Sequence, residues 1–135
     1  MELIIDENLS LKEIQQSFTA TFPYLKIEFY ETNNNLFEVS VKKNPLDKNL
    51  ILKNIRSLES FGALSISPEE KVVDVERNFF EIYGLNVQIF RRSANLWLQT
   101  TATDNWTLEH QNEIGKESLK HEHAEILDFE LTDNE

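Results

Sequence analysis

The chain contains two copies of one apolar pattern. At an offset of 61 residues, Leu11, Ile14, Phe18 and Phe22 correspond to Val72, Val75, Phe79 and Tyr83. After one deletion the offset is 60, and Ile27, Phe29, Tyr30, Leu36 and Phe37 correspond to Val87, Ile89, Phe90, Leu96 and Trp97. Apolar matches that stay in phase over this length indicate one folding unit present twice in tandem.

Each copy has the pattern of a β-α-β-β unit. The runs ELIID and ALSIS alternate apolar and polar residues, which is typical of a strand. The apolar residues that follow fall at i, i+3, i+7 and i+11, a spacing that predicts a helix with one buried stripe. Each helix precedes two apolar-rich runs, LKIEFY and LFEVSV in the first copy and LNVQIF and LWLQTT in the second. Asn-rich or Ser-Ala-Asn turns separate these runs, and the pattern therefore predicts hairpins.

Local signals mark where the two main helices begin. Ser10 and Glu13 have the spacing of a capping box, in which each side chain bonds the other residue's backbone N–H. In the second copy, Ser67, Pro68 and Glu70 supply a cap, a first-turn proline and a box partner. These signals differ in register by about one turn.

A further helix is expected after each hairpin. The stretch NPLDKNLILKNIRSL offers a single apolar face made of Leu46, Leu50, Ile51, Ile55 and Leu58. The stretch DNWTLEHQNEIG predicts a shorter helix, with Thr107 as its cap and Gly115 as its stop.

These elements predict an α+β fold made of tandem β-α-β-β repeats related by a pseudo-twofold axis. Pro23 and Gly84 end the two main helices, the hairpins are antiparallel, and the helices pack on one sheet face. A single globular domain covers residues 1–115, with repeats at 1–60 and 61–115. Residues 116–135 are expected to form an acidic, flexible C-terminal tail. Its segment AEILDFEL keeps enough apolar residues to dock as a strand or helical turn instead.

Composition limits the classes of protein to which the chain can belong. It has 135 residues, 40% of them hydrophobic, which suits one domain with a real core. It contains no cysteine, and no apolar run approaches the length of a membrane span. We therefore expect a cytoplasmic protein without a membrane segment. The formal net charge is −11, and residues 116–135 hold two basic against seven acidic side chains, which disfavours nucleic acid as a partner.

Two segments of the second copy resemble known proteins. They are YGLNVQIFRRS, within residues 72–93, and TATDNWTLEHQN, residues 101–112. Both are similar to segments of small acidic bacterial proteins of unknown function, and FPYLKIEFY in the first copy is a weaker match. The resemblance implies no activity, cofactor or partner.

Signatures of catalysis are missing from the sequence. Three scattered glycines cannot build a phosphate loop, and no nucleophile elbow is present. The pair His121 and His123 forms a crude metal motif, but we favour solvated tail histidines and predict no metal site. The carboxylates of the second helix are expected to form its solvated face: Glu69, Glu70, Asp74, Glu76 and Glu81. We predict no cofactor and favour a non-enzymatic protein.

The hairpin of the second copy is the most distinctive feature. With its turn centred on Ser93 and Ala94, Phe90 lies opposite Trp97 and Ile89 opposite Leu98. One strand face then carries Val87, Ile89 and Leu98, and the other carries Gln88, Phe90, Trp97 and Gln99. The aromatic pair is either a packing device covered by the other half or a second subunit, or an exposed platform flanked by arginines.

We therefore expect a protein-interaction or self-association module that uses this aromatic face, with a homodimer as its self-associated form. Its candidate partner-binding residues are Tyr30, Phe37, Phe90, Arg91, Arg92, Trp97 and Gln99. The alternative is a small-ligand-binding or catalytic domain with a pocket between the repeats. Gln88, Arg91, Gln99 and Thr101 would line that pocket.

Overall fold

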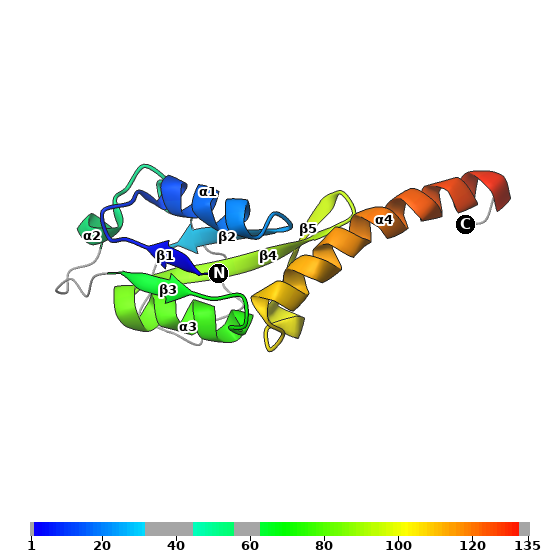
Figure 1. Cartoon of the computed structure of the whole chain (residues 1–135). Helices are drawn as coiled ribbons and strands as arrows, with labels where there is room; N and C mark the ends of the chain where they lie inside the picture. Colours follow the sequence, from blue (N-terminus) through cyan, green and yellow to red (C-terminus); the bar gives the residue numbers. More distant parts are fainter. Residues whose placement is uncertain (1, 32–44, 56–62, 133–135) are drawn as a thin grey trace.

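The computed structural model describes residues 2–31, 45–55 and 63–132, which form an α+β fold (Figure 1). These residues build four α-helices and two antiparallel sheets. In chain order the elements are β1 (Leu3–Ile5), α1 (Leu11–Thr21), β2 (Leu25–Tyr30), α2 (Leu52–Ile55), β3 (Leu64–Ile66), α3 (Val72–Tyr83), β4 (Asn86–Ser93), β5 (Leu96–Gln99), the 3-10 helix η1 (Thr101–Thr103) and α4 (Leu108–Thr132).

The two main helices bury the predicted stripes. In α1 the buried residues are Leu11, Ile14 and Phe18, and in α3 they are Val72, Val75, Phe79 and Tyr83. Helix α3 ends at Gly84, whose φ of 68° is the left-handed conformation that glycine adopts without steric cost. Helix α1 ends just before Pro23, as predicted.

Both sheets pair a strand of the first half with a strand of the second. Strand β1 pairs with β3, with Ile4 opposite Ser65, and β2 pairs with β4, with Glu28 opposite Gln88. Strand β5 then adds to β4, which gives the order β2-β4-β5. The other strand of the predicted first hairpin, LFEVSV, lies outside the described residues.

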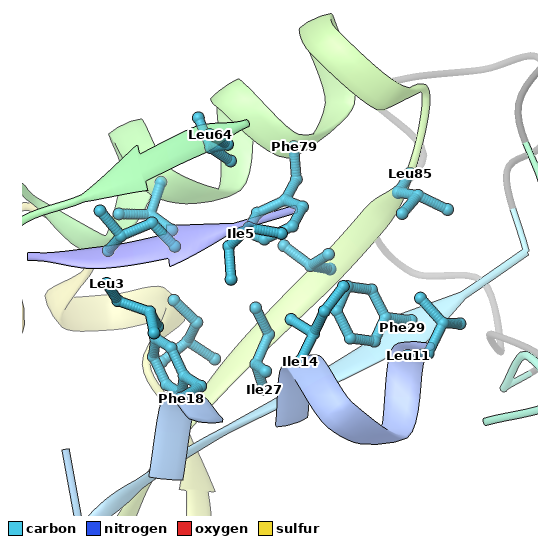
Figure 2. Close-up of a cluster of buried hydrophobic side chains, with 14 of the residues drawn as sticks. Leu3, Ile5, Leu11, Ile14, Phe18, Ile27, Phe29, Leu64, Phe79 and Leu85 are labelled. Carbon is cyan, nitrogen blue, oxygen red and sulfur yellow. The ribbon is translucent and has the colours of Figure 1, made fainter. Parts of the chain in front are cut away.

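The core lies between the two sheets and the helices. Figure 2 shows Ile5 of β1, Ile14 of α1, Ile27 of β2 and Phe79 of α3 converging on one cluster. Phe29 and Phe79 meet edge to face, with ring centroids 5.7 Å apart. In Figure 1 the β1–β3 ribbon lies between α1 and α3. The apolar stripes of both helices and one face of both sheets are therefore buried in a single core.

The first turn of α1 is capped as predicted and is also bonded by a distant loop. Ser10 and Glu13 form the capping box, with Oγ of Ser10 accepting from N–H of Glu13 at 3.1 Å. The next amides donate to the loop before α2, Leu11 to Leu50 and Lys12 to Lys48, both at 2.9 Å.

The first turn of α3 is capped only by the distant loop. Its N-cap is Lys71, without a side-chain bond, so the prediction that Ser67, Pro68 and Glu70 start the helix is wrong. Instead the first two amides donate to the loop before α4, Val72 to Trp106 at 3.0 Å and Val73 to Asp104 at 2.8 Å. The backbone carbonyls of Trp106 and Asp104 therefore take the capping role that was predicted for Ser67.

The two closing helices differ from their predicted forms. Within the described residues α2 covers only Leu52–Ile55, and it buries Leu52 while Leu50 is exposed, so the predicted apolar face is wrong in part. Helix α4 begins at Leu108 after the predicted cap, with Thr107 Oγ1 accepting from N–H of His110 at 3.1 Å.

Helix α4 does not stop at Gly115 but continues to Thr132. Much of the expected acidic tail is therefore helical, and Figure 1 shows this helix running away from the rest of the molecule. Gly115 does not end the helix but allows α4 to pack closely against Tyr24 and Arg91. A Cβ there would lie 2.9 Å from Tyr24 Cβ, 3.1 Å from Tyr24 O and 3.2 Å from Arg91 Cγ.

Candidate interaction surface on the β4–β5 hairpin

The β4–β5 turn lies one residue later than predicted. Ser93 pairs with Leu96, so the turn residues are Ala94 and Asn95, and Ala94 takes φ of 58°. The predicted pairs Phe90–Trp97 and Ile89–Leu98 are therefore wrong. Arg92 lies opposite Trp97 and Arg91 opposite Leu98. Each residue of β4 lies opposite a residue two positions later on β5 than predicted. Because this difference is an even number of residues, each side chain keeps its predicted face.

One face of the β2-β4-β5 sheet is packed against helices. The buried residues Leu25, Ile27, Phe29, Val87 and Ile89 point to this face. Helix α1 packs against β2, and α3 and α4 pack against β4. The second half of the chain therefore joins the sheet edge to edge, and Gln88, which points to the other face, is also buried.

The opposite sheet face carries a cluster of two aromatic and two basic side chains, Lys26, Phe90, Arg92 and Trp97, which we call the sheet-face cluster. Phe90 and Trp97 are half-buried. The Lys26 ammonium lies 5.2 Å from the ring centroid of Phe90 and 5.1 Å from that of Trp97. The Arg92 guanidinium lies 5.2 Å from the Trp97 centroid. Cations within about 6 Å of a ring face are attracted to it, so this cluster is pre-ordered.

The surroundings of the cluster are polar. Glu28 lies beside it and forms a 3.6 Å ion pair with Lys26. Gln99 is exposed and lies opposite Phe90. Tyr30 lies on the same face but at the far end of β2, where burial, and secondarily the charge of Glu28, raise the pKa of its hydroxyl.

One of the predicted partner-binding residues points away from this cluster. Arg91 points to the helix-packed face, where its Nη1 donates to Gln111 Oε1 at 2.8 Å and its guanidinium lies 5.6 Å from the Trp106 ring. Burial lowers the pKa of Arg91 from its ordinary value. Phe37 lies outside the described residues. The alternation of a strand places Arg91 and Arg92 on opposite faces, which the sequence pattern already implied.

The structure contains an open groove, but this groove does not lie between the two repeats, where a pocket was expected. An open groove of about 860 Å³ runs along α1 and β2, within the first half. It is lined mainly by polar residues: Lys12, Gln15, Gln16, Thr19, Lys26, Glu28, Lys48 and Asn49, with Ala20 and Ile27. None of Gln88, Arg91, Gln99 and Thr101 contributes to it.

The prediction that the carboxylates of the second helix form a solvated face is wrong in part. Glu76 Oε2 accepts from the N–H of Ile89 at 3.0 Å. Glu70 is half-buried, and burial is the main reason why its pKa lies above the ordinary value. Among the described residues no cluster of His, Asp or Glu could hold a metal ion, and the side chains of His121 and His123 are outside that description.

Comparison with protein-family models, with curated proteins and with solved structures finds no match to this chain. Within residues 2–31, 45–55 and 63–132, no helix combines the length and the apolar character needed to cross a bilayer.

Proposed function

We propose that this protein is a non-enzymatic interaction module, which works in the cytoplasm and associates with itself or with another protein through the sheet-face cluster. The observation that carries the proposal is the half-buried pair Phe90 and Trp97, held under Lys26 and Arg92 on the face opposite the packed helices. Large aromatic and arginine side chains that are already ordered lose little conformational entropy on binding.

Charge supports a protein partner over nucleic acid. The cluster holds two cations on a chain whose formal net charge is −11. Nucleic-acid affinity depends on a broad basic footprint that releases counterions. A small basic and aromatic patch instead suits a protein surface that is acidic at its rim and apolar at its centre.

Sedimentation equilibrium of the full chain tests the proposal in its self-associating form. We expect a dimer or larger complex whose dissociation constant rises at least tenfold, about 1.4 kcal/mol, in Trp97→Ala and in Phe90→Ala. Gln16→Ala on the exposed surface of α1 is the control and should leave the mass unchanged. Association that is identical in the wild type and in both aromatic variants would contradict a role for the cluster.

We also propose that the domain is a tandem duplication with a pseudo-twofold axis. Two pairs of facing residues support it: Ile4 and Ser65 are 61 positions apart, and Glu28 and Gln88 are 60 positions apart, the two offsets of the sequence repeat. A twofold axis relating the halves would bring such equivalent residues opposite each other.

The loop bonds at the two helix starts supply a second line of support for the duplication. The isolated bridge Ser10–Ile51 next to α1 has a counterpart in Lys71–Thr107 next to α3. Because each sheet combines strands from both halves, fragments 1–62 and 63–135 should each be unfolded alone and regain helical circular dichroism when mixed. A fragment that folds cooperatively by itself would contradict this arrangement.

A further inference from the structure

The outer edge of β2 is covered by hydrogen bonds from the chain itself. Unpaired strand edges are templates for other chains, and proteins commonly cover them. On this edge the carbonyl of Leu25 accepts from Thr19 Oγ1 at 3.1 Å, that of Ile27 from Gln15 Nε2 at 2.8 Å and that of Phe29 from the N–H of Leu46 at 3.0 Å.

The edge of β4 is also covered where β5 stops. The N–H of Ile89 donates to Glu76 Oε2 at 3.0 Å. The carbonyl of Ile89 accepts from Thr100, from Oγ1 at 2.7 Å and from N–H at 3.2 Å. The fold therefore satisfies the backbone at this gap in the sheet as well.

The outer edge of β5 is different. Since Thr100 bonds Ile89, the alternation of an antiparallel ladder directs the backbone groups of Leu96 and Leu98 to β4 and those of Trp97 and Gln99 outward. No residue in the described part of the chain forms a hydrogen bond with these outward groups. Within the described residues the outer edge of β5 is therefore unpaired.

Exposed apolar side chains concentrate on the same strand. Of the four large hydrophobic residues that are exposed in the described part of the chain, Leu96 at 61% and Leu98 at 42% lie on β5, and Ile4 and Leu50 lie elsewhere. The strand also lacks the lysine or proline that commonly protects an edge. Both its backbone and its side chains are thus suited to pairing.

We propose that β5 pairs with β5 of a second copy of this chain, antiparallel and about a twofold axis at Trp97. This proposal rests on the self-associating form of the proposed function and specifies its surface. Leu96 then lies opposite Leu98 of the second copy, and the two Trp97 side chains lie opposite each other on the other face. The two three-stranded sheets become one sheet of six strands.

Two observations favour a second copy over another extended chain. The sequence Leu96-Trp97-Leu98 is the same in both directions, so it is complementary to itself about a twofold axis, as an isologous interface requires. Residues 93–103 contain no ionisable side chain, so pairing two copies of a chain with a charge of −11 opposes no like charges along the strand.

Cysteine trapping in the full chain tests the register. The sequence has no cysteine, so a single substitution places the only thiol. Positions 96 and 98 of two copies would form a non-hydrogen-bonded pair with Cα atoms about 4.5 Å apart, within the range of a disulfide. Like positions would be diagonal neighbours about 7–8 Å apart, which is too far. Leu96→Cys mixed with Leu98→Cys should therefore form at least several times more disulfide dimer on mild oxidation than either variant alone.

The matched control uses the two exposed apolar residues outside β5. Ile4→Cys mixed with Leu50→Cys has similar exposure and should cross-link only at the rate of random collision. Equal cross-linking in the mixed, unmixed and control reactions would overturn the proposal, as would cross-linking of Leu98→Cys with itself alone.

A charge placed on the edge provides a second, non-covalent test. Leu98→Lys should raise the dissociation constant in sedimentation at least tenfold, with an unchanged circular dichroism spectrum, and Leu50→Lys should not. A dimer that is weakened by Phe90→Ala but not by Leu98→Lys would overturn β5 pairing while the sheet-face cluster kept its role. A chain that stays monomeric in sedimentation and gives no specific cross-link would overturn both.

Discussion

The guanidinium of Arg91 and the side-chain amide of Gln111 form a 2.8 Å hydrogen bond that joins β4 to α4. Gln111 is fully buried and also donates to Thr103, to the carbonyl at 2.7 Å and to Oγ1 at 2.9 Å. Nε of Arg91 is already buried without a partner among the described residues.

Gln111→Ala should therefore be one of the most destabilising polar substitutions in the chain. It removes the partner of a charged donor and leaves a cavity, so we expect a loss of about 2–3 kcal/mol in the free energy of unfolding. Urea unfolding followed by circular dichroism measures it. Gln16→Ala, at an exposed position of α1, is the control and should change stability by less than about 0.5 kcal/mol. Equal effects at the two glutamines would show that the buried network contributes nothing.

The two serines that the sequence marks as helix caps should differ in their contribution. Ser10 accepts a bond from Glu13 in a complete capping box, whereas the helix of the second copy begins at Val72 after an N-cap lysine. Ser10→Ala should cost about 1 kcal/mol, and Ser67→Ala should cost less because it removes no helix cap. The two losses in the free energy of unfolding are compared by measuring the urea midpoint of each variant and multiplying its shift by the wild-type slope. A larger loss at Ser67 would contradict the assigned helix start.

This contrast shows how far local sequence signals predict the fold. The stripes of both main helices and the faces of the hairpin strands follow from periods of 3.6 and 2.0 residues, which depend on nearby residues alone. The left-handed Gly84 follows from glycine's tolerance of positive φ at a helix end, which is also a local property. The start of α3 could not be predicted in this way, because its first amides bond Trp106 and Asp104, more than thirty residues ahead in the chain.

The surface was harder to predict than the core for the same reason. The turn was predicted at Ser93 and Ala94 but lies at Ala94 and Asn95, where Ala94 adopts a positive φ that alanine seldom takes. Glycine at 115 resembled a helix stop, but its role is the close approach to Tyr24. The contribution of Lys26 to the aromatic cluster depends on the pairing of β2 with β4 across the two halves, for which no short motif exists.

Gly115→Ala should destabilise the protein even though alanine favours helices. The new methyl group would meet the backbone oxygen and Cβ of Tyr24 at 3.1 Å and 2.9 Å, and these atoms cannot move without separating α4 from the sheet. We expect a net loss of about 1–3 kcal/mol, the range for an overpacked core. Thermal unfolding measures it, and a gain in stability would mean that α4 does not pack this closely.

Gly84→Ala should destabilise for a different reason. No atom lies within 4 Å of the added methyl group, but φ of 68° is unfavourable for any residue with a Cβ. The expected loss is about 1–2 kcal/mol. Gly84→Asn should recover part of it, since asparagine tolerates the left-handed conformation. If alanine and asparagine had the same effect, backbone strain would not be the cause.

Glu70→Gln should stabilise the protein near neutral pH, with an effect that disappears in acid. Burial, aided by the charges of Asp74 and Glu2 and opposed by a backbone hydrogen bond at Ser67, raises the pKa of Glu70 in the folded state. A raised pKa means that the stability linked to the protonated carboxyl is present below the unfolded-state pKa and is lost as pH rises through the folded-state value. The wild type therefore carries a cost at neutral pH that glutamine removes.

The measurement is the difference in urea midpoint between Glu70→Gln and the wild type, followed from below the ordinary glutamate pKa of about 4.3 to neutral pH. The difference should grow with pH in favour of the variant and then level off. Because the other carboxylates titrate in both proteins, their effects largely cancel in this difference. Glu69→Gln, which removes the charge of an exposed neighbour, is the control for the loss of one carboxylate from this segment. A flat profile for Glu70→Gln would show that its carboxyl ionises as freely in the folded protein as in the unfolded chain.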